Sequence, residues 1–183
     1  MKNKLLLGLI ALVGCYGMTA AQSTDDVAQL KFNQRSYEGS VSANLSITPF
    51  KIGASTLHGI RFDNTEAVDI PSFFIGLTLG WQPWTDGQII YYAVQPRIYF
   101  PTYNTNEYYF AMDIGCNSGI TTLKSGKTYI DYKFYFNPML GAMIPLSERI
   151  DLDLSLRVQF LERAFSEGGT QIPIVALSAG IRF

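Results

Sequence analysis

The sequence lacks any hydrophobic run long enough to form a transmembrane helix. Its longest apolar run covers residues 5–15, whereas a helix that spans a bilayer needs about 18 or more consecutive apolar residues. Charge is also scarce, because Asp, Glu, Lys and Arg make up only 16% of the 183 residues, against roughly 25% in an ordinary soluble domain. The formal net charge is −1. This balance argues against a nucleic acid as partner, because proteins that bind phosphate backbones carry a basic surplus or stripe.

Residues that support catalysis or bind metals are few as well. The chain has two cysteines and one histidine, with no cluster of the two for a transition metal and no glycine-rich phosphate loop. We therefore expect neither a metal nor a cofactor. His58 is the candidate for histidine-dependent acyl transfer, but alternation along its segment places it with Ile60 and Phe62, on the face opposite Ser55. That placement does not suit a Ser-His pair, and we expect no enzymatic activity.

Residues 1–21 have the three-part layout of a secretory signal peptide: lysines, then the apolar run, then small residues that end at Ala21. We expect cleavage after Ala21. An alternative is a lipoprotein signal, because the residues that lead up to Cys15 resemble a lipobox. Under both interpretations Cys116 has no disulfide partner within the chain. Residues 22–35 are polar without a clear period and are typical of a short N-terminal extension.

Residues 36–183 are dominated by alternation of apolar with polar or small residues. The segment DLDLSLRVQF shows the pattern clearly, and a strand with two unlike faces requires it because successive side chains point to opposite sides. Eight segments share this pattern: residues 38–48, 53–63, 72–84, 88–100, 106–118, 129–144, 149–162 and 171–183. The connections between them are short enough for neighbouring strands to be antiparallel.

The length of these segments favours one all-β architecture. Strands of soluble proteins usually have about 5 to 6 residues, whereas a tilted strand that spans a membrane needs about 9 to 11. The sequence therefore predicts an eight-stranded antiparallel up-and-down transmembrane β-barrel. Alternation alone leaves open which face points inward, since a soluble barrel has an apolar interior and a membrane barrel a polar one.

Charged residues in mid-strand favour a polar interior. They can pair with one another across a narrow lumen instead of facing bulk water. We predict that these residues form a structural network of ion pairs and hydrogen bonds; the alternative is a gated conduit for small solutes. The network is predicted to include Arg97, Glu107, Asp113, Lys133, Asp153, Arg157 and Arg182.

Aromatic residues on the apolar face favour the same orientation. Because chain direction alternates between neighbouring strands, they fall into two belts at opposite rims, as expected at the two interfaces of a membrane. One predicted belt consists of Phe73, Phe100, Tyr108 and Phe183, and the other of Trp81, Tyr92, Phe134 and Phe160. The alternation of Val175, Leu177, Ala179, Ile181 and Phe183 resembles the signal by which outer-membrane barrels are recognised for assembly.

Segments such as SFFIGLTLGW, YFNPMLGAMIPL and IPIVALSAGIRF resemble the small eight-stranded outer-membrane β-barrel proteins of Gram-negative bacteria. The resemblance covers about residues 36–183 and depends on pattern more than on invariant motifs. It implies a monomer in the cell outer membrane, with membrane lipid and the barrel assembly machinery as partners. It also implies periplasmic chain ends, with the connections near residues 86, 124–127 and 167–170 facing outward.

The function expected from this resemblance is structural or an interaction through the outward loops, whose partner the sequence does not identify. A narrow channel for small solutes is an alternative. A secreted or lipid-anchored barrel of the lipocalin kind, with its apolar face turned inward around a ligand, is a second alternative. A few barrels of this size are lipid A enzymes that use a histidine, but the position of His58 does not favour that activity.

Overall fold

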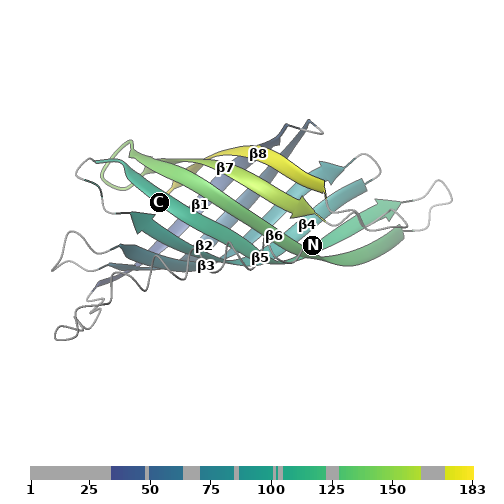
Figure 1. The fold of residues 1–183 in the computed structure, drawn as a ribbon, viewed down its shortest axis with the longest axis horizontal. Helices are drawn as coiled ribbons and strands as arrows, with labels where there is room; N and C mark the ends of the chain where they lie inside the picture. Colours follow the sequence, from purple (N-terminus) through teal and green to yellow (C-terminus); the bar gives the residue numbers. More distant parts are fainter. Residues whose placement is uncertain are drawn as a thin grey trace, which may run out of the picture. The chain divides into compact units, whose positions relative to one another are not determined.

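The computed structural model describes residues 34–47, 50–63, 71–84, 87–100, 102, 105–122, 128–161 and 172–183. They belong to a compact unit that covers Phe32–Phe183 and is built from strands (Figure 1). The strands are β1 (Gln34–Ser46), β2 (Lys51–Asp63), β3 (Ser72–Trp84), β4 (Gly87–Phe100), β5 (Glu107–Thr122), β6 (Thr128–Pro145), β7 (Asp151–Leu161) and β8 (Ile172–Arg182). In this part of the chain, no helix is long and apolar enough to cross a membrane. The predicted signal peptide lies outside the described residues.

The eight strands form a closed barrel in chain order, and β8 pairs with β1 to complete the ring. Every neighbouring pair is antiparallel, which confirms the predicted all-β, eight-stranded fold. A path around the ring can be followed by moving from each residue to its paired residue on the next strand. Such a path starts at Ser36 of β1 and returns to β1 at Ser46. This stagger requires the strands to tilt, as Figure 1 shows. The path passes through Ser36, Arg61, Phe74, Arg97, Ala111, Met139, Arg157, Ala176 and Ser46.

We call the rim at which β1 begins and β8 ends the terminal rim, and the opposite rim the distal rim. The connections at 85–86, 123–127 and 162–171 lie outside the described residues. Each of these connections is at the distal rim, because β3, β5 and β7 end there and β4, β6 and β8 begin there. The resemblance assigns these three connections to the outer side.

Two strands extend furthest beyond an end that the alternation predicts. β1 begins at Gln34, inside the segment predicted as an extension, and β5 continues to Thr122, beyond its predicted end at residue 118. Gln34 pairs with Asp63, and Thr122 pairs with Thr128. Ladder hydrogen bonds therefore continue through polar and small residues that show no alternation, so a hydrophobic pattern underestimates these strands.

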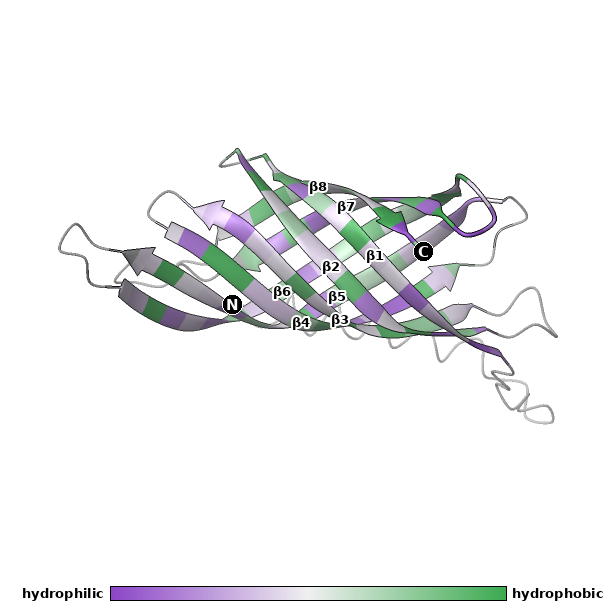
Figure 2. Ribbon diagram, turned by 180° about the vertical axis from the view of Figure 1, so that it is seen from behind, coloured by the Kyte–Doolittle hydropathy of each residue, from purple (hydrophilic) through white to green (hydrophobic). Residues whose placement is uncertain are grey.

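The alternation separates an apolar outer face from a largely polar inner face. Bands of opposite hydropathy succeed one another along the strands in Figure 2. Large apolar residues such as Leu77 and Leu140 are exposed on the outside, whereas Asn44, Asp113 and Asn137 are at most 2% exposed in the lumen. The barrel is thus inverted relative to a soluble one, whose apolar side chains point inward.

The lumen also contains large aromatic side chains, which the sequence analysis did not place there. One buried cluster near the terminal rim includes Phe74, Tyr99 and Tyr109, and a second near the distal rim includes Tyr91 and Tyr135. Inward-facing glycines make room for these rings. A Cβ atom at Gly80 would collide with the ring of Tyr91, and one at Gly141 with the ring of Tyr109. Alternation of small and large residues fills the interior of a small barrel in this way.

Two prolines interrupt the ladders without changing their register. Strands β4 and β5 pair from Gln88 to Val94 and again from Arg97 to Phe100, on either side of Pro96, in one register. Strands β6 and β7 do the same around Pro138. A proline lacks the N–H that a ladder bond needs, which explains the interruptions. No residue is inserted at either position, so neither proline forms a bulge.

Candidate functional site: a polar network in the lumen

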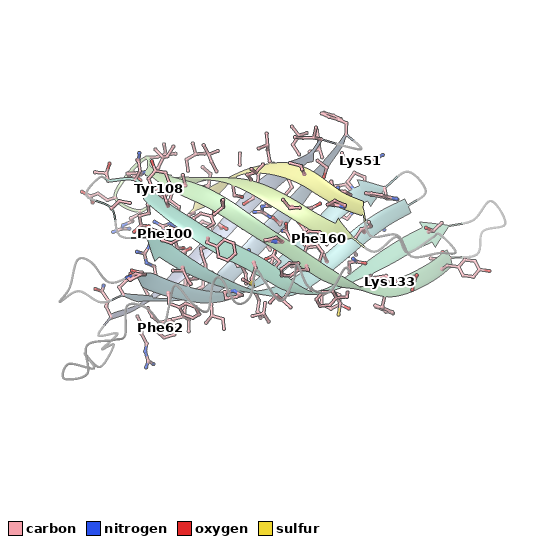
Figure 3. The ribbon with its side chains drawn as sticks, viewed as in Figure 1. Lys51, Phe62, Phe100, Tyr108, Lys133 and Phe160 are labelled. Atoms are coloured by element: carbon pink, nitrogen blue, oxygen red, sulfur yellow. The ribbon has the colours of Figure 1, made fainter. Side chains whose placement is uncertain are left out.

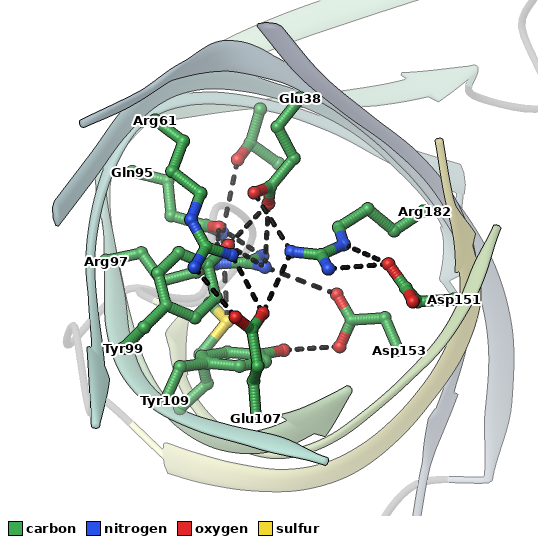
Figure 4. A network of polar contacts seen from close by, with 12 residues as sticks. Glu38, Arg61, Gln95, Arg97, Tyr99, Glu107, Tyr109, Asp151, Asp153 and Arg182 are labelled. Atoms are coloured by element: carbon green, nitrogen blue, oxygen red, sulfur yellow. Dashed lines mark hydrogen bonds and ion pairs between the residues drawn. The ribbon is translucent and has the colours of Figure 1, made fainter. Parts of the chain in front are cut away.

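A network of charged side chains fills the lumen near the terminal rim (Figure 4). Each side chain points inward because it lies on the inner face of its strand. The strands bring together residues that are far apart in sequence: Glu38 on β1, for example, meets Arg97 on β4 and Arg182 on β8. The charged members are Glu38, Arg61, Asp63, Arg97, Glu107, Asp151, Asp153 and Arg182.

Arg97 lies at the centre of this network and is only 1% exposed. Its Nη1 is 3.4 Å from Glu38 Oε1 and 3.5 Å from Asp153 Oδ2. Its Nε and Nη2 both donate to Gln95 Oε1, at 3.2 and 2.8 Å. The guanidinium therefore shares its charge between two buried carboxylates and has its remaining donors directed at an amide oxygen. Such complete pairing is what a buried cation requires.

A second set of ion pairs lies closer to the terminal rim. Arg182 Nη1 is 3.2 Å from Glu38 Oε2 and 3.3 Å from Glu107 Oε2, and its Nη2 is 2.5 Å from Asp151 Oδ2. Arg61 donates both Nη atoms to the Glu107 carboxylate, at 2.8 and 2.7 Å, in the bidentate geometry that makes arginine pairs strong. Glu38 and Glu107 each bridge two arginines, so the two sets form one continuous network.

Two tyrosines connect the ion pairs to the aromatic cluster beneath them. Tyr99 donates its hydroxyl to Glu38 Oε1, and Tyr109 donates to Asp153 Oδ1, both at 2.5 Å. The guanidinium of Arg97 lies 4.1 Å from the centre of the Tyr109 ring, and that of Arg61 lies 4.2 Å from the Tyr99 ring. Cations over aromatic faces at these distances attract the ring electrostatically. Charged groups and rings together form one packed layer in the lumen.

Asp113 forms a separate layer in mid-lumen and is fully buried. Its Oδ1 accepts hydrogen bonds from Gln95 Nε2 at 2.7 Å and Thr78 Oγ1 at 3.0 Å, and its Oδ2 accepts one from Asn137 Nδ2 at 2.8 Å. Because Gln95 also accepts from Arg97, this layer is joined to the ion-pair network by one amide side chain.

The structure brings together four of the seven charged residues predicted for the lumen network. Arg97, Glu107, Asp153 and Arg182 belong to it. Asp113 lies in the adjoining layer, and Arg157 is buried beside Ser155, whose hydroxyl accepts from its Nε at 3.0 Å. Lys133 lies apart near the distal rim, half-exposed, with its Nζ 3.6 Å from Asp131 Oδ2. It has the inward parity of the others but a position too far along its strand to reach them.

Glu38 was not predicted as a member of the network, although its carboxylate contacts two arginines and a tyrosine. The signal was present, since Glu38 has the same parity as Ser40 and Ser42 on the polar face of β1. Tyr99 and Tyr109 were missed because their rings count as apolar while their hydroxyls bind carboxylates.

The network lines a polar pocket of about 280 Å³ at the terminal rim, formed in part by Arg61, Asp63, Asp151 and Arg182. No group of three or more His, Cys, Asp or Glu side chains among the described residues is arranged to hold a metal ion.

The aromatic residues predicted for the two belts lie on the outer side of the barrel. Phe100 pairs with Tyr108 at the terminal rim, and Figure 3 shows both at the end opposite Lys51 and Lys133. Phe73 lies near the start of β3 and Phe183 directly follows β8 at the same rim, whereas Trp81, Tyr92, Phe134 and Phe160 belong to the distal half of their strands. Along β8 the side chains of Val175, Leu177, Ile181 and Phe183 are exposed, and Ala179 shares their face.

His58 lies on the outer face and Ser55 on the inner face, as their parity predicts. Both ring nitrogens of His58 are hydrogen-bonded to hydroxyl groups other than that of Ser55. Nδ1 is 2.5 Å from Tyr37 Oη, and Nε2 is 2.8 Å from Thr56 Oγ1. Thr56 donates its own hydrogen to the carbonyl of Ser40, so it accepts from the Nε2–H of His58. This outward trio has no carboxylate member and does not form a catalytic triad.

The architecture defines the chain as a closed eight-stranded barrel with the faces of a membrane barrel, and comparison with known proteins agrees. No protein-family model and no curated protein sequence matches the chain. Among solved structures, Neisserial surface protein A (NspA) is similar with a TM-score of 0.54 at 14% identity, over 81% of this chain and 97% of that one. Ail, the attachment invasion locus protein of Yersinia pestis, is similar with a TM-score of 0.55 at 12% identity, over the same shares. Ail in complex with the heparin analogue sucrose octasulfate gives 0.53 at 12%.

These neighbours are eight-stranded outer-membrane barrels. At such identities they show that this chain shares their fold.

Proposed function

We propose that this protein is a non-enzymatic outer-membrane β-barrel, exported by a cleaved signal peptide, whose role is structural or an interaction through its distal loops. The observation that carries the proposal is the inverted barrel. Every strand places at least one large apolar side chain in an exposed position on the outer face, from Val41 on β1 to Val175 on β8. A monomeric soluble protein rarely exposes a contiguous apolar patch of more than a few hundred Å², whereas a bilayer requires such a surface.

The two sets of outward aromatic residues support the same location. Tyr and Trp have an apolar ring with a polar atom, and this suits them to the level of lipid headgroups. Tyr108 at the terminal rim is 49% exposed and Trp81 in the distal half is 44% exposed. We propose that they mark the two edges of the lipid-facing band, with lipid and the barrel assembly machinery as partners of a monomer.

Neither alternative has comparable support. A lipocalin-like barrel would need an apolar lumen around its ligand, whereas Arg97, Asp113 and Asn137 line this one. A channel would need a continuous polar path, but the ion-pair network and the rings of Tyr99 and Tyr109 occupy the lumen. Barrels of this size are just wide enough for their own side chains.

The proposed interaction role through the loops is suggested by the structural neighbour Ail. Ail bears the name of an attachment and invasion protein, and one of its structures holds a heparin analogue. We propose that the distal connections of this chain, at 85–86, 123–127 and 162–171, likewise provide its contact surface.

Membrane fractionation combined with a heat-modifiability gel tests the location. We expect the protein in the outer-membrane fraction, and we expect a folded band in detergent that shifts in mobility only after boiling. A soluble protein, or the absence of a folded band, would contradict the proposal. Lipid A from strains with and without the protein should be identical, and any modification that depends on the protein would show enzymatic activity.

A further inference from the structure

Arg157 differs from the other arginines of the lumen in having no carboxylate partner. It is 4% exposed, and its Nε donates a hydrogen bond to Ser155 Oγ. Its Nη1 is buried without a hydrogen-bond partner, and no described carboxylate forms an ion pair with it. Arg61, Arg97 and Arg182 each contact at least two carboxylates.

Asp113, the other charged group of mid-lumen, attracts the Arg157 guanidinium electrostatically but forms no contact ion pair with it. Three donors already occupy its two oxygens, from Thr78, Gln95 and Asn137. A buried cation without a contact anion carries a desolvation penalty of several kcal/mol. A contact anion would offset this penalty.

The side chain next to Arg157 on the same face is also unsatisfied. Gln159 is 1% exposed, and neither its Nε2 nor its Oε1 has a partner. Buried polar groups in native proteins are almost always hydrogen-bonded, to protein, water or an ion. The guanidinium and the amide of Gln159 thus offer unused donors, and the oxygen of Gln159 calls for a water molecule beside them.

Packed side chains bound this region on both sides. Toward the distal rim lies the cluster of Ile89, Tyr91, Tyr135 and Ile174, in which the rings of Tyr91 and Tyr135 stack at 4.9 Å. Toward the terminal rim lies the network centred on Arg97. Low-dielectric surroundings of this kind strengthen the attraction between a cation and an anion.

We propose that Arg157, with Gln159, forms an anion site in the lumen that holds a small inorganic anion of halide size in contact with the guanidinium. A single negative charge gives the guanidinium a contact anion and accepts from the unused N–H groups of Arg157 and Gln159. The ligand has to be small because an eight-stranded barrel is nearly filled by its own side chains.

Bromide locates the site directly. The full chain is extracted in detergent, folded in bromide and crystallised, and anomalous scattering is measured at the bromine edge. We expect a bromide peak within hydrogen-bond distance of the Arg157 guanidinium. Ordered water alone at that position, or no density, would overturn the proposal. The result does not depend on the cellular location of the protein, so it is independent of the proposed function.

A solution measurement gives the strength of binding. Unfolding is followed in chloride and in gluconate at equal ionic strength, because gluconate is too large for the site. At a chloride concentration about 100-fold above its dissociation constant, the unfolding equilibrium constant should fall by about 100-fold. Equal stability in the two salts at every concentration would refute binding.

Variants assign the effect to the site. Arg157→Gln should abolish the difference between chloride and gluconate, and Arg149→Gln, which changes an exposed arginine in the turn after β6, should retain it. If Arg157→Gln does not fold, Gln159→Leu keeps the guanidinium and removes one donor, and it should weaken the chloride dependence. A chloride effect that is unchanged in the folded Arg157→Gln variant, or in Gln159→Leu, would overturn the assignment.

Discussion

Replacing Arg97 with methionine removes the cation that Glu38 and Asp153 share. Methionine keeps most of the side-chain volume and introduces no new charge. After the change Asp153 retains its bond from the Tyr109 hydroxyl, and Glu38 retains Arg182 and Tyr99. Both carboxylates stay in the lumen, where they are 3% and 5% exposed. The variant therefore leaves buried negative charge that is only partly compensated.

The expected loss of stability follows from that burial. Removing one partner of a buried ion pair destabilises a protein by about 3–5 kcal/mol, because the remaining charge is left without compensation. Lys133→Met is the matched control, since its pair with Asp131 is about one-third exposed at each side chain. Solvated pairs of this kind contribute about 0–1 kcal/mol. Arg97→Met should therefore lose at least about 2 kcal/mol more than Lys133→Met.

Urea unfolding of the barrel in lipid vesicles, followed by tryptophan fluorescence and by the folded band on a gel, measures both variants. A combined Arg97→Met and Asp153→Asn variant should recover part of the loss, because it removes the cation and one of its carboxylates together. Equal stability of Arg97→Met and Lys133→Met would refute the reasoning. So would a combined variant in which the two losses simply add, since that would show that Arg97 and Asp153 are not coupled.

Leu154→Arg places a charge on the outer face of β7 and should lower stability in vesicles by about 2–4 kcal/mol if that position faces the bilayer centre. Leu146→Arg, in the exposed turn after β6, should change it by less than about 0.5 kcal/mol, and equal losses would argue against a lipid-facing surface. Gly80→Val should lose about 1–3 kcal/mol through collision with Tyr91, and adding Tyr91→Ala should restore part of it; no recovery would contradict the packing described. Single-channel recordings of the reconstituted protein should show no stepwise currents, because side chains fill the lumen, and reproducible steps would reveal a conducting path.

The alternation of side chains was sufficient to predict the number, order and faces of the strands, because a strand has a period of two and each barrel strand has two unlike environments. The ends of the strands were less well predicted. In β5, residues Gly119, Thr121 and Thr122 continue the ladder with β6, but small and polar side chains do not report which face they occupy. The end of β5 is determined by backbone hydrogen bonds, which the hydropathy of the side chains does not indicate.

Parity predicted which charged residues point inward but not which of them meet. That depends on the register between strands and on the stagger around the ring. Lys133 has the right parity and the wrong position along β6, while Glu38 reaches Arg182 only because β8 pairs with β1. The rings of Tyr99 and Tyr109 were assigned no inward role because hydropathy treats tyrosine as apolar. Its hydroxyl makes it suitable for a lumen that contains carboxylates.

The ion pair between Glu38 and Arg182 spans the seam where β1 meets β8. The network therefore bears on the order of events in folding. All other neighbouring strands are joined by short connections, whereas the seam joins the two ends of the sheet, where Gly39–Ile47 pair with Val175–Phe183. Contacts between residues so distant in sequence form late. Until the seam closes, Glu38 and Arg182 lie on opposite edges of an open sheet. They can form their ion pair only when the ring closes. Any substitution that weakens this ion pair should therefore first slow the closure of the barrel.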